Sequence, residues 1–229
     1  MSIVETPSPN FNERQLPVTM IVLHYTGMES AAAAIARLTD PVAQVSAHYL
    51  IDEDGAVHAL VPEDQRAWHA GASHWRGITD VNSASIGIEL VNPGHEYGYR
   101  DFPDAQIDAL VPLMQAIKDR HGITRGNIVG HSDIAPTRKQ DPGERFPWGK
   151  LARLRLAMPR PTRNLMDPLW SDAGFLLALE RFGYDVTDRL AAVVAFQRRF
   201  RPELIDGEID GECRSLLLAL LLPKPQGDE

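Results

Sequence analysis

Histidine and carboxylate side chains carry most of the chemistry that this sequence could perform. Eight histidines accompany a single cysteine, Cys213, in a chain of 229 residues. One thiol excludes an intramolecular disulfide, and it excludes any zinc site that needs two or more thiolates from one chain. A metal bound by this chain would therefore be held by imidazole and carboxylate groups.

Two of the histidines follow short apolar segments, His24 after Ile21–Leu23 and His131 after Ile128–Gly130, and Asp141 lies in the loop beyond. Binding residues often occupy strand ends and the loops that follow them, because a rigid scaffold holds them there near solvent. Two imidazoles, one carboxylate and an open fourth position describe a catalytic zinc site. Because the three residues are far apart in sequence, spacing alone leaves a structural, hydrogen-bonded role open for each histidine.

Glu89 is the second candidate for chemistry. It lies in the segment Ser85–Val91, where apolar and small or polar residues alternate. Alternation places Glu89 and Gly87 on the face opposite the apolar residues. Glu89 therefore either meets solvent or lines a polar cavity, and Gly87 leaves room beside it for a ligand or another backbone.

The elements that must position these residues alternate between strands and helices. Helix caps, period-two patterns and turn residues predict a strand over Thr19–Tyr25, a helix from Ser30 to near Leu38, a hairpin of Ser46–Ile51 and Ala56–Val61, a helix over Asp104–His121 stopped by Gly122, and a strand over Asn127–Gly130. Pro112 should kink the long helix. We expect an α/β fold with a central mixed β-sheet flanked by helices.

A change in composition divides the chain near residues 158–163, where two prolines and two arginines interrupt the helical patterns. After this break the sequence reads as helices only. We therefore predict a larger domain over residues 1–160, a small three-helix domain over residues 163–222 and a tail over residues 223–229.

Charge and hydropathy restrict the partners and the location. With 31 acidic and 23 basic residues the formal charge is −8, which argues against nucleic acid or an anionic membrane as the main partner. No segment reaches the roughly 18–20 apolar residues of a membrane span, and the first thirty residues lack the features of an export signal. These observations predict a cytoplasmic protein, with the periplasm as the alternative if a signal has been removed.

Five segments together resemble a known family. They are Ile21–Thr26, Ser46–Ile51, Ala67–Gly71, Asn82–Leu90 and Gly130–Trp148. In this order they are similar to the zinc-dependent N-acetylmuramoyl-L-alanine amidases of the type 2 amidase and peptidoglycan-recognition-protein group. The resemblance covers residues 18–150.

The resemblance implies roles for individual residues. It makes His24, His131 and Asp141 the ligands of a zinc ion, because these three residues match the ligand positions of the family's motifs. It makes Glu89 the catalytic glutamate and Lys139 a basic residue that steadies the developing oxyanion.

Substrate contacts follow less directly from the same motifs. Tyr49 matches a tyrosine near the metal in some members, and His69 resembles a substrate-contacting position, although a hydrogen-bonded loop histidine is the alternative. The neighbouring Trp68 and Arg66 complete the expected substrate-binding residues, with Arg66 able to meet a carboxylate of the substrate.

The implied activity is hydrolysis of the amide bond between N-acetylmuramic acid, or its 1,6-anhydro form, and the L-alanine of peptidoglycan stem peptides. We expect a monomer that binds peptidoglycan fragments, with Zn²⁺ as its cofactor, in cell-wall recycling. Three alternatives stay open: a non-catalytic peptidoglycan-recognition protein, an envelope amidase acting on intact wall, and a zinc amidohydrolase with another substrate.

Residues 163–222 resemble the three-helix peptidoglycan-binding module of many wall hydrolases. Gly183-Tyr184, Phe196-Gln197 and the Asp-Gly turns carry this similarity. The same residues also fit a plain helical core that packs against the amidase, because Asp-Gly pairs mark turns in any protein. The sequence leaves glycan binding and packing equally open.

Overall fold

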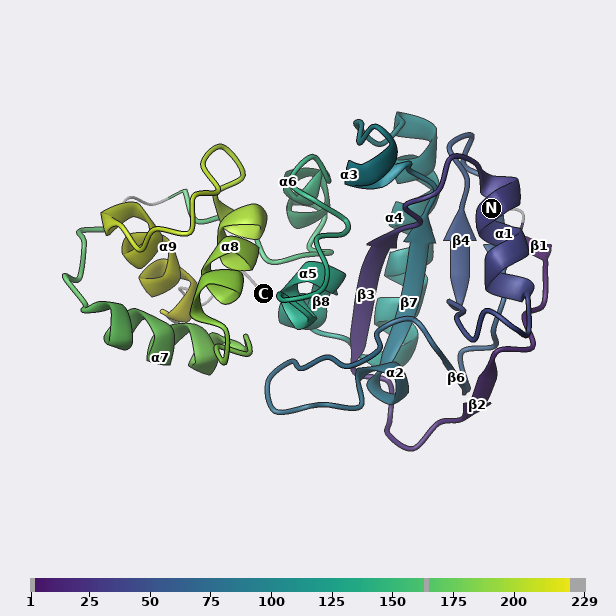
Figure 1. The fold of residues 1–229 in the computed structure, drawn as a ribbon, viewed down its shortest axis with the longest axis horizontal. Helices are drawn as coiled ribbons and strands as arrows, with labels where there is room; N and C mark the ends of the chain where they lie inside the picture. Colours follow the sequence, from purple (N-terminus) through teal and green to yellow (C-terminus); the bar gives the residue numbers. More distant parts are fainter. Residues whose placement is uncertain (1–2, 163–164, 223–229) are drawn as a thin grey trace.

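The fold consists of a β-sheet with helices on both faces and three further helices beside one edge of the sheet (Figure 1). It is a computed structural model that describes residues 3–162 and 165–222. The tail predicted over residues 223–229 lies outside the described residues. Within those residues, no helix is both long and apolar enough to cross a membrane.

The central sheet is mixed, as predicted. Within the described ranges it has six strands, in the order β1 (Ile3–Glu5), β5 (Val57–Ala59), β4 (Tyr49–Ile51), β7 (Ser85–Leu90), β3 (Met20–Tyr25) and β8 (Ile128–Gly130). The strands β4, β7, β3 and β8 run parallel to one another, whereas β4 and β5 form the predicted antiparallel hairpin. A separate antiparallel pair joins β2 (Phe11–Glu13) to β6 (Gln65–Ala67).

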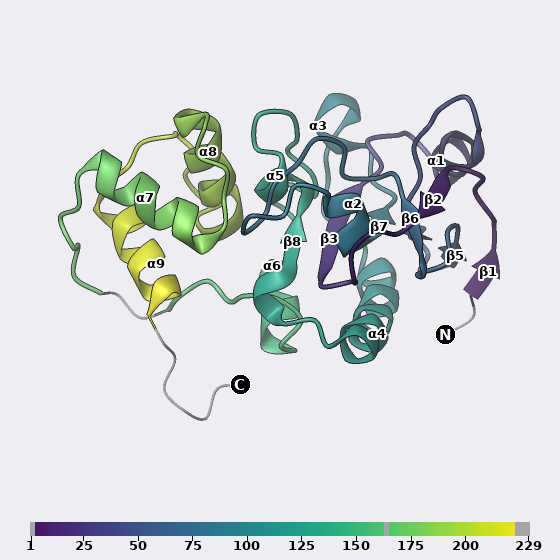
Figure 2. The same ribbon diagram turned by 90° about the horizontal axis from the view of Figure 1, so that it is seen from below.

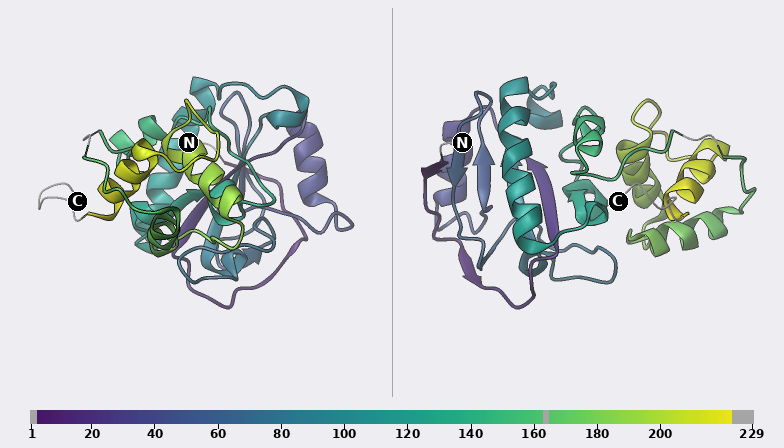
Figure 3. Two further views of the ribbon diagram at one scale, coloured as in Figure 1. Left: turned by 60° about the vertical axis from the view of Figure 1, so that its left-hand side comes forward. Right: turned by 180° about the vertical axis from the view of Figure 1, so that it is seen from behind.

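Different helices cover the two faces of the sheet. The long helix α4 (Asp104–His121) covers one face, and its Ile107 and Leu110 pack with Ile21 of β3 and Ile88 of β7 in one buried cluster. Figures 2 and 3 show α4 along this face, with α1 (Ala31–Thr39) across the sheet from it. Because side chains alternate along a strand, the remaining residues of β3 and β7 point away from α4.

The helices α1 and α4 begin and end close to where the sequence predicts. The hydroxyl of Ser30 accepts a hydrogen bond from the backbone N–H of Ala33 at the start of α1. The helix α4 continues through Pro112 and stops at Gly122, whose φ of 64° suits glycine. Short elements connect the larger ones: α2 (Val81–Ala84), α3 (Gly94–Tyr97), the 3-10 turn η1 (Arg125–Asn127), α5 (His131–Ile134) and α6 (Trp148–Arg153).

The C-terminal part contains the three predicted helices, α7 (Asp172–Phe182), α8 (Arg189–Phe200) and α9 (Gly211–Leu221). A Ser or Asp side chain caps the N-terminus of each. Phe175 and Phe196 from these helices belong to the same buried cluster as Trp75 and Val129 of the larger part. The hydrophobic core is therefore continuous from the sheet into the helical unit.

Candidate metal centre and active site

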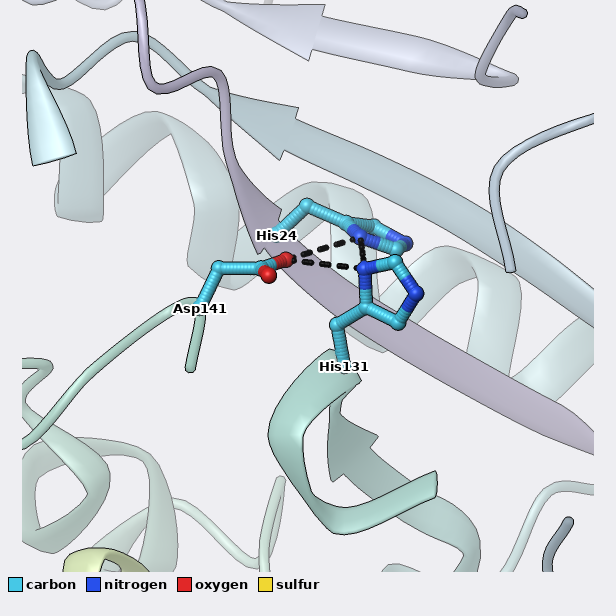
Figure 4. Close-up of side chains that lie close together, drawn as sticks. All are labelled: His24, His131 and Asp141. Atoms are coloured by element: carbon cyan, nitrogen blue, oxygen red, sulfur yellow. Dashed lines mark hydrogen bonds and ion pairs between the residues drawn. The ribbon is translucent and has the colours of Figure 1, made fainter. Parts of the chain in front are cut away.

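Three of the predicted residues meet at one end of the sheet. His24 lies near the end of β3, His131 begins α5 immediately after β8, and Asp141 lies in the following loop. Because β3 and β8 are parallel neighbours, their carboxyl ends meet at the same edge. The Nδ1 atoms of the two histidines are 2.9 Å apart, and each is 3.1 Å from Oδ2 of Asp141 (Figure 4).

The three side chains are buried, with 1%, 4% and 6% of their residues' surfaces exposed for His24, His131 and Asp141. Burial, together with the charge of His131, lowers the pKa of His24 to about 4, so this imidazole is neutral at pH 7. Burial alone would raise the pKa of Asp141, but the neighbouring histidines hold it well below its ordinary value. The cluster is therefore a carboxylate with imidazole nitrogens around it.

The hydrogen bonds of His131 show that this cluster suits a cation. Its Nε2 lies 3.1 Å from the backbone oxygen of Ala70, and a carbonyl can only accept. Nε2 therefore donates to this carbonyl, and the other ring nitrogen, Nδ1, faces the Asp141 carboxylate. Two imidazole nitrogens and one carboxylate oxygen thus converge on one point, and this arrangement suits a cation. Among the residues that the structure describes, these three form the group that could hold a metal ion.

Glu89 lies beside this group in a cavity of about 350 Å³. It pairs in register with His24 across β7 and β3, and both side chains project from the face turned away from α4. The Oε2 atom of Glu89 is buried and has no hydrogen-bond partner within the described residues. Burial, and then the charge of Asp141, raise the pKa of Glu89 well above its ordinary value. An unpaired buried carboxyl oxygen facing a cavity is available for proton transfer.

Lys139 and Trp68 line the same cavity, together with His69. Lys139 is exposed, and the loop that carries it is held by a hydrogen bond from its backbone N–H to the oxygen of Ala135 at 3.0 Å. The Trp68 indole N–H donates to Oδ1 of Asn12 at 2.6 Å, which fixes the ring at the rim. Both ring nitrogens of His69 are engaged, by His24 and by Ser85.

The other two predicted substrate contacts are not at the cavity and need correction. Tyr49 lies on the α4 face of the sheet, where it packs with the buried cluster and donates its hydroxyl hydrogen to Glu63 at 2.7 Å. Its place on that face follows from its pairing with Ile88. Arg66 forms an ion pair with Asp80 at 2.9 Å instead of reaching the cavity. Similarity of motif identified these residues but could not show which way they point.

The sequence did not identify Asp133 and Asn82, whose hydrogen bonds hold the backbone next to the cluster. Asp133, in the turn that begins with His131, accepts hydrogen bonds from Tyr184 of the C-terminal part and from the backbone N–H of Gly130. Asn82 accepts from the backbone N–H groups of His69 and Ala70. Asn82 lies in a recognisable motif and could have been found there, whereas no pattern links Tyr184 to Asp133.

Comparison with known proteins identifies a family that this chain matches. Residues 14–144 match the family described as N-acetylmuramoyl-L-alanine amidase. The N-acetylmuramoyl-L-alanine amidase AmiD of Escherichia coli strain K12 is 39% identical over 230 residues, which cover 89% of this chain and 82% of that protein.

Two solved structures are also similar over most of the chain. The complex of Escherichia coli AmiD with anhydro-N-acetylmuramic acid-L-Ala-D-γ-Glu-L-Lys has a TM-score of 0.81 at 36% identity, and covers 93% of this chain and 97% of its own. AmpDh3 from Pseudomonas aeruginosa, in complex with an anhydromuramic pentapeptide, has a TM-score of 0.81 at 34% identity and covers 88% and 90%. The likeness therefore includes the C-terminal helices as well as the sheet.

Proposed function

Because the chain belongs to the N-acetylmuramoyl-L-alanine amidase family, we propose that it hydrolyses the amide bond between N-acetylmuramic acid and the L-alanine of peptidoglycan stem peptides. The observation that carries this proposal is the convergence of His24, His131 and Asp141 beside the unpaired carboxyl oxygen of Glu89.

Zinc is the metal that we assign to His24, His131 and Asp141. Two neutral imidazoles and a carboxylate are the ligand types of catalytic zinc sites, and they leave a position open for substrate or water. When bound, zinc supplies Lewis-acid polarisation of the scissile carbonyl and lowers the pKa of water at the site. The convergence of Nδ1 of His24, Nδ1 of His131 and Oδ2 of Asp141 supports this assignment.

Glu89 is the residue that we propose to move protons. As a carboxylate it takes a proton from the attacking water, whose oxygen bonds to the carbonyl carbon. When the carbon–nitrogen bond breaks, Glu89 returns that proton to the departing nitrogen of L-alanine. The products are the lactyl carboxyl group of the sugar and the free amine of the peptide, so atoms and charge balance.

Positive charge at the cavity has two proposed uses. The ammonium group of Lys139 offsets the negative charge that develops on the carbonyl oxygen. Arg37, an exposed residue of α1, lines the same cavity and replaces Arg66 as our candidate for a stem-peptide carboxylate. Both groups supply locally the attraction for an anionic fragment that a chain of net charge −8 lacks as a whole.

Soluble 1,6-anhydro fragments are the substrate form that we propose, and cell-wall recycling is the process. Both solved structures named above hold anhydromuramyl peptides, which supports this form. The cytoplasmic location and the monomeric state remain predictions from the sequence. Cell fractionation and light scattering would test them.

The deciding experiment compares rates on a soluble anhydro-muropeptide and on insoluble sacculus, with products identified by mass spectrometry. We expect faster release of the free stem peptide from the soluble substrate. Faster cleavage of sacculus would point to an envelope amidase, and cleavage at a different bond would point to another amidohydrolase. Bound zinc without cleavage of either substrate would overturn the catalytic proposal in favour of a recognition protein.

For the C-terminal helices we propose a packing role with the larger domain, over the predicted residues 163–222. The shared core and the Tyr184–Asp133 hydrogen bond support packing. A glycan-binding role would require the exposed helix surface, so we would replace exposed Leu177 of α7 by Asp and measure sedimentation with sacculus. Unchanged co-sedimentation is the expected result, and loss of binding would favour the glycan-binding alternative.

A further inference from the structure

Two consecutive residues of one loop contact the outward-facing nitrogens of both histidine ligands. The backbone oxygen of Ala70 lies 3.1 Å from Nε2 of His131, and Nδ1 of His69 lies 3.1 Å from Nε2 of His24. Each histidine thus turns Nδ1 to the metal cluster and Nε2 to this loop. The carbonyl accepts, so Nε2 of His131 carries a proton, whereas in the His24–His69 contact either ring nitrogen can be the donor.

The hydrogen bonds beyond His69 decide where the protons lie. The Ser85 hydroxyl donates to the backbone oxygen of Val81 at 2.6 Å, so its Oγ is left to accept from Nε2 of His69 at 3.3 Å. The His69 ring is buried and its nitrogens contact His24 and Ser85 but no carboxylate, so it carries the single proton that it donates to Ser85. With that proton on Nε2, Nδ1 of His69 is an acceptor, and His24 must donate from its own Nε2.

The fold fixes the His69 ring firmly in this position. Oδ1 of Asn82 accepts from the backbone N–H groups of His69 at 3.0 Å and Ala70 at 2.7 Å. The ring lies against Gly87 of β7, where a Cβ atom would come within 2.4 Å of the His69 Cγ. Glycine at position 87 is therefore required by the His69 ring, which occupies the room that the missing side chain leaves.

We propose that His69 is a positioning residue for the metal, which acts by holding His24 in the tautomer that presents Nδ1 to the cluster, and that it is not a substrate contact. This inference rests on the proposed zinc site. A ligand histidine with its second nitrogen fixed loses less freedom on binding the ion and is more basic. Removing such a partner typically weakens metal binding about 10–100-fold.

The test is the zinc dissociation constant, measured by competition with a chelator, for wild type, His69→Leu and His69→Asn. We expect about 10–100-fold weaker binding in His69→Leu. His69→Asn should retain most of the affinity, because its Oδ1 is the same number of bonds from Cα as Nδ1 of histidine and can accept from His24. A substrate contact would behave differently, with an unchanged zinc dissociation constant and a raised KM in both variants.

A second pair of variants tests the same contact without altering His69. Gly87→Ala displaces the His69 ring, so it should weaken zinc binding as His69→Leu does. Gly149→Ala is the matched control, since an added Cβ in α6 would find its nearest neighbour at an ordinary 3.7 Å. Circular dichroism of each metal-free variant separates a binding defect from a folding defect.

If the variants do not fold, nitrogen-15 NMR of the zinc-loaded wild type still decides the matter. We expect Nε2 of both His24 and His69 to carry the proton, and a proton on Nδ1 of His69 would overturn the proposal. Equal zinc affinity in wild type and His69→Leu would also overturn it. Failure of wild type itself to bind zinc would instead overturn the proposed metal site, so the two failures are distinguishable.

Discussion

The hydroxyl group of Tyr184, which follows α7, donates to Oδ1 of Asp133 in α5 at 2.6 Å, and both residues are buried. The other carboxyl oxygen of Asp133 accepts from the backbone N–H of Gly130 at 2.8 Å, directly before His131. The C-terminal helical unit therefore holds the turn that presents a proposed metal ligand. A segment that resembles a wall-binding module is, in this fold, part of the support of the active site.

Tyr184→Phe should destabilise the protein. The variant keeps the ring in the core but leaves a buried oxygen of Asp133 without its donor, which costs about 1–3 kcal/mol. Urea unfolding measures the loss. Tyr97→Phe is the control, because Tyr97 is 53% exposed and its change should stay within about 0.5 kcal/mol. A Tyr184→Phe variant as stable as wild type would show that this hydrogen bond adds nothing.

Glu89→Ala should abolish most activity without releasing the metal. Loss of the proposed proton-transfer group predicts a fall in kcat of roughly 10²–10⁴-fold. Muropeptide cleavage gives the rate, and metal analysis of the same sample confirms the zinc content. Undiminished activity in a zinc-loaded variant would rule out the proposed mechanism.

Asp141→Ala should lose zinc while the fold survives. The variant removes one of three ligands, yet the surrounding strands β3 and β8 keep their pairing and their core contacts. Metal analysis after dialysis checks the loss, and circular dichroism checks the fold. The matched control is Asp108→Ala on the exposed surface of α4, which should keep its zinc. Retention of zinc by Asp141→Ala would remove this residue from the ligand set.

Glu63 predicts a measurable acid dependence of stability. Burial alone would raise its pKa, but hydrogen bonds from Arg120, His121 and Tyr49 outweigh burial and lower it. Because the folded pKa is the lower one, the unfolded chain binds the proton more readily, and acid favours unfolding. The stabilisation is complete above the ordinary glutamate pKa of about 4.3 and is lost as the pH falls through the folded value.

The measurement for Glu63 is the unfolding free energy of wild type and Glu63→Gln as a function of pH. We expect wild type to be the more stable protein near pH 7 and its advantage to shrink below about pH 4.3. A difference between the two proteins that does not change with pH would show that the Glu63 carboxylate does not contribute in this way.

Much of the fold could be predicted because the strands and helices near the site carry strong local signals. The alternation in Ser85–Leu90 and the caps of α1 and α4 are such signals. The strands β1 and β2 were missed because each has only three residues, too few to show an alternating pattern.

Part of the site was also predictable, because local motifs mark several of its residues. Motifs place His24, Glu89 and His131 on or directly after strands whose order can be guessed, and the structure brings them together. Tyr49 was misplaced because alternation assigns it a face only relative to its neighbours in the strand. Which face holds the cavity depends on α4, more than fifty residues later in the chain.

The two histidines of the proposed metal site, His24 and His131, are separated by 107 residues in the sequence, although strands β3 and β8 are adjacent in the sheet. Strand β8 is the last strand in chain order and occupies the edge of the sheet. Contacts between such distant segments require closure of a long loop and form slowly. We therefore expect the metal site to be completed late in folding. A ribosome-bound chain that ends before β8 could not acquire the ion.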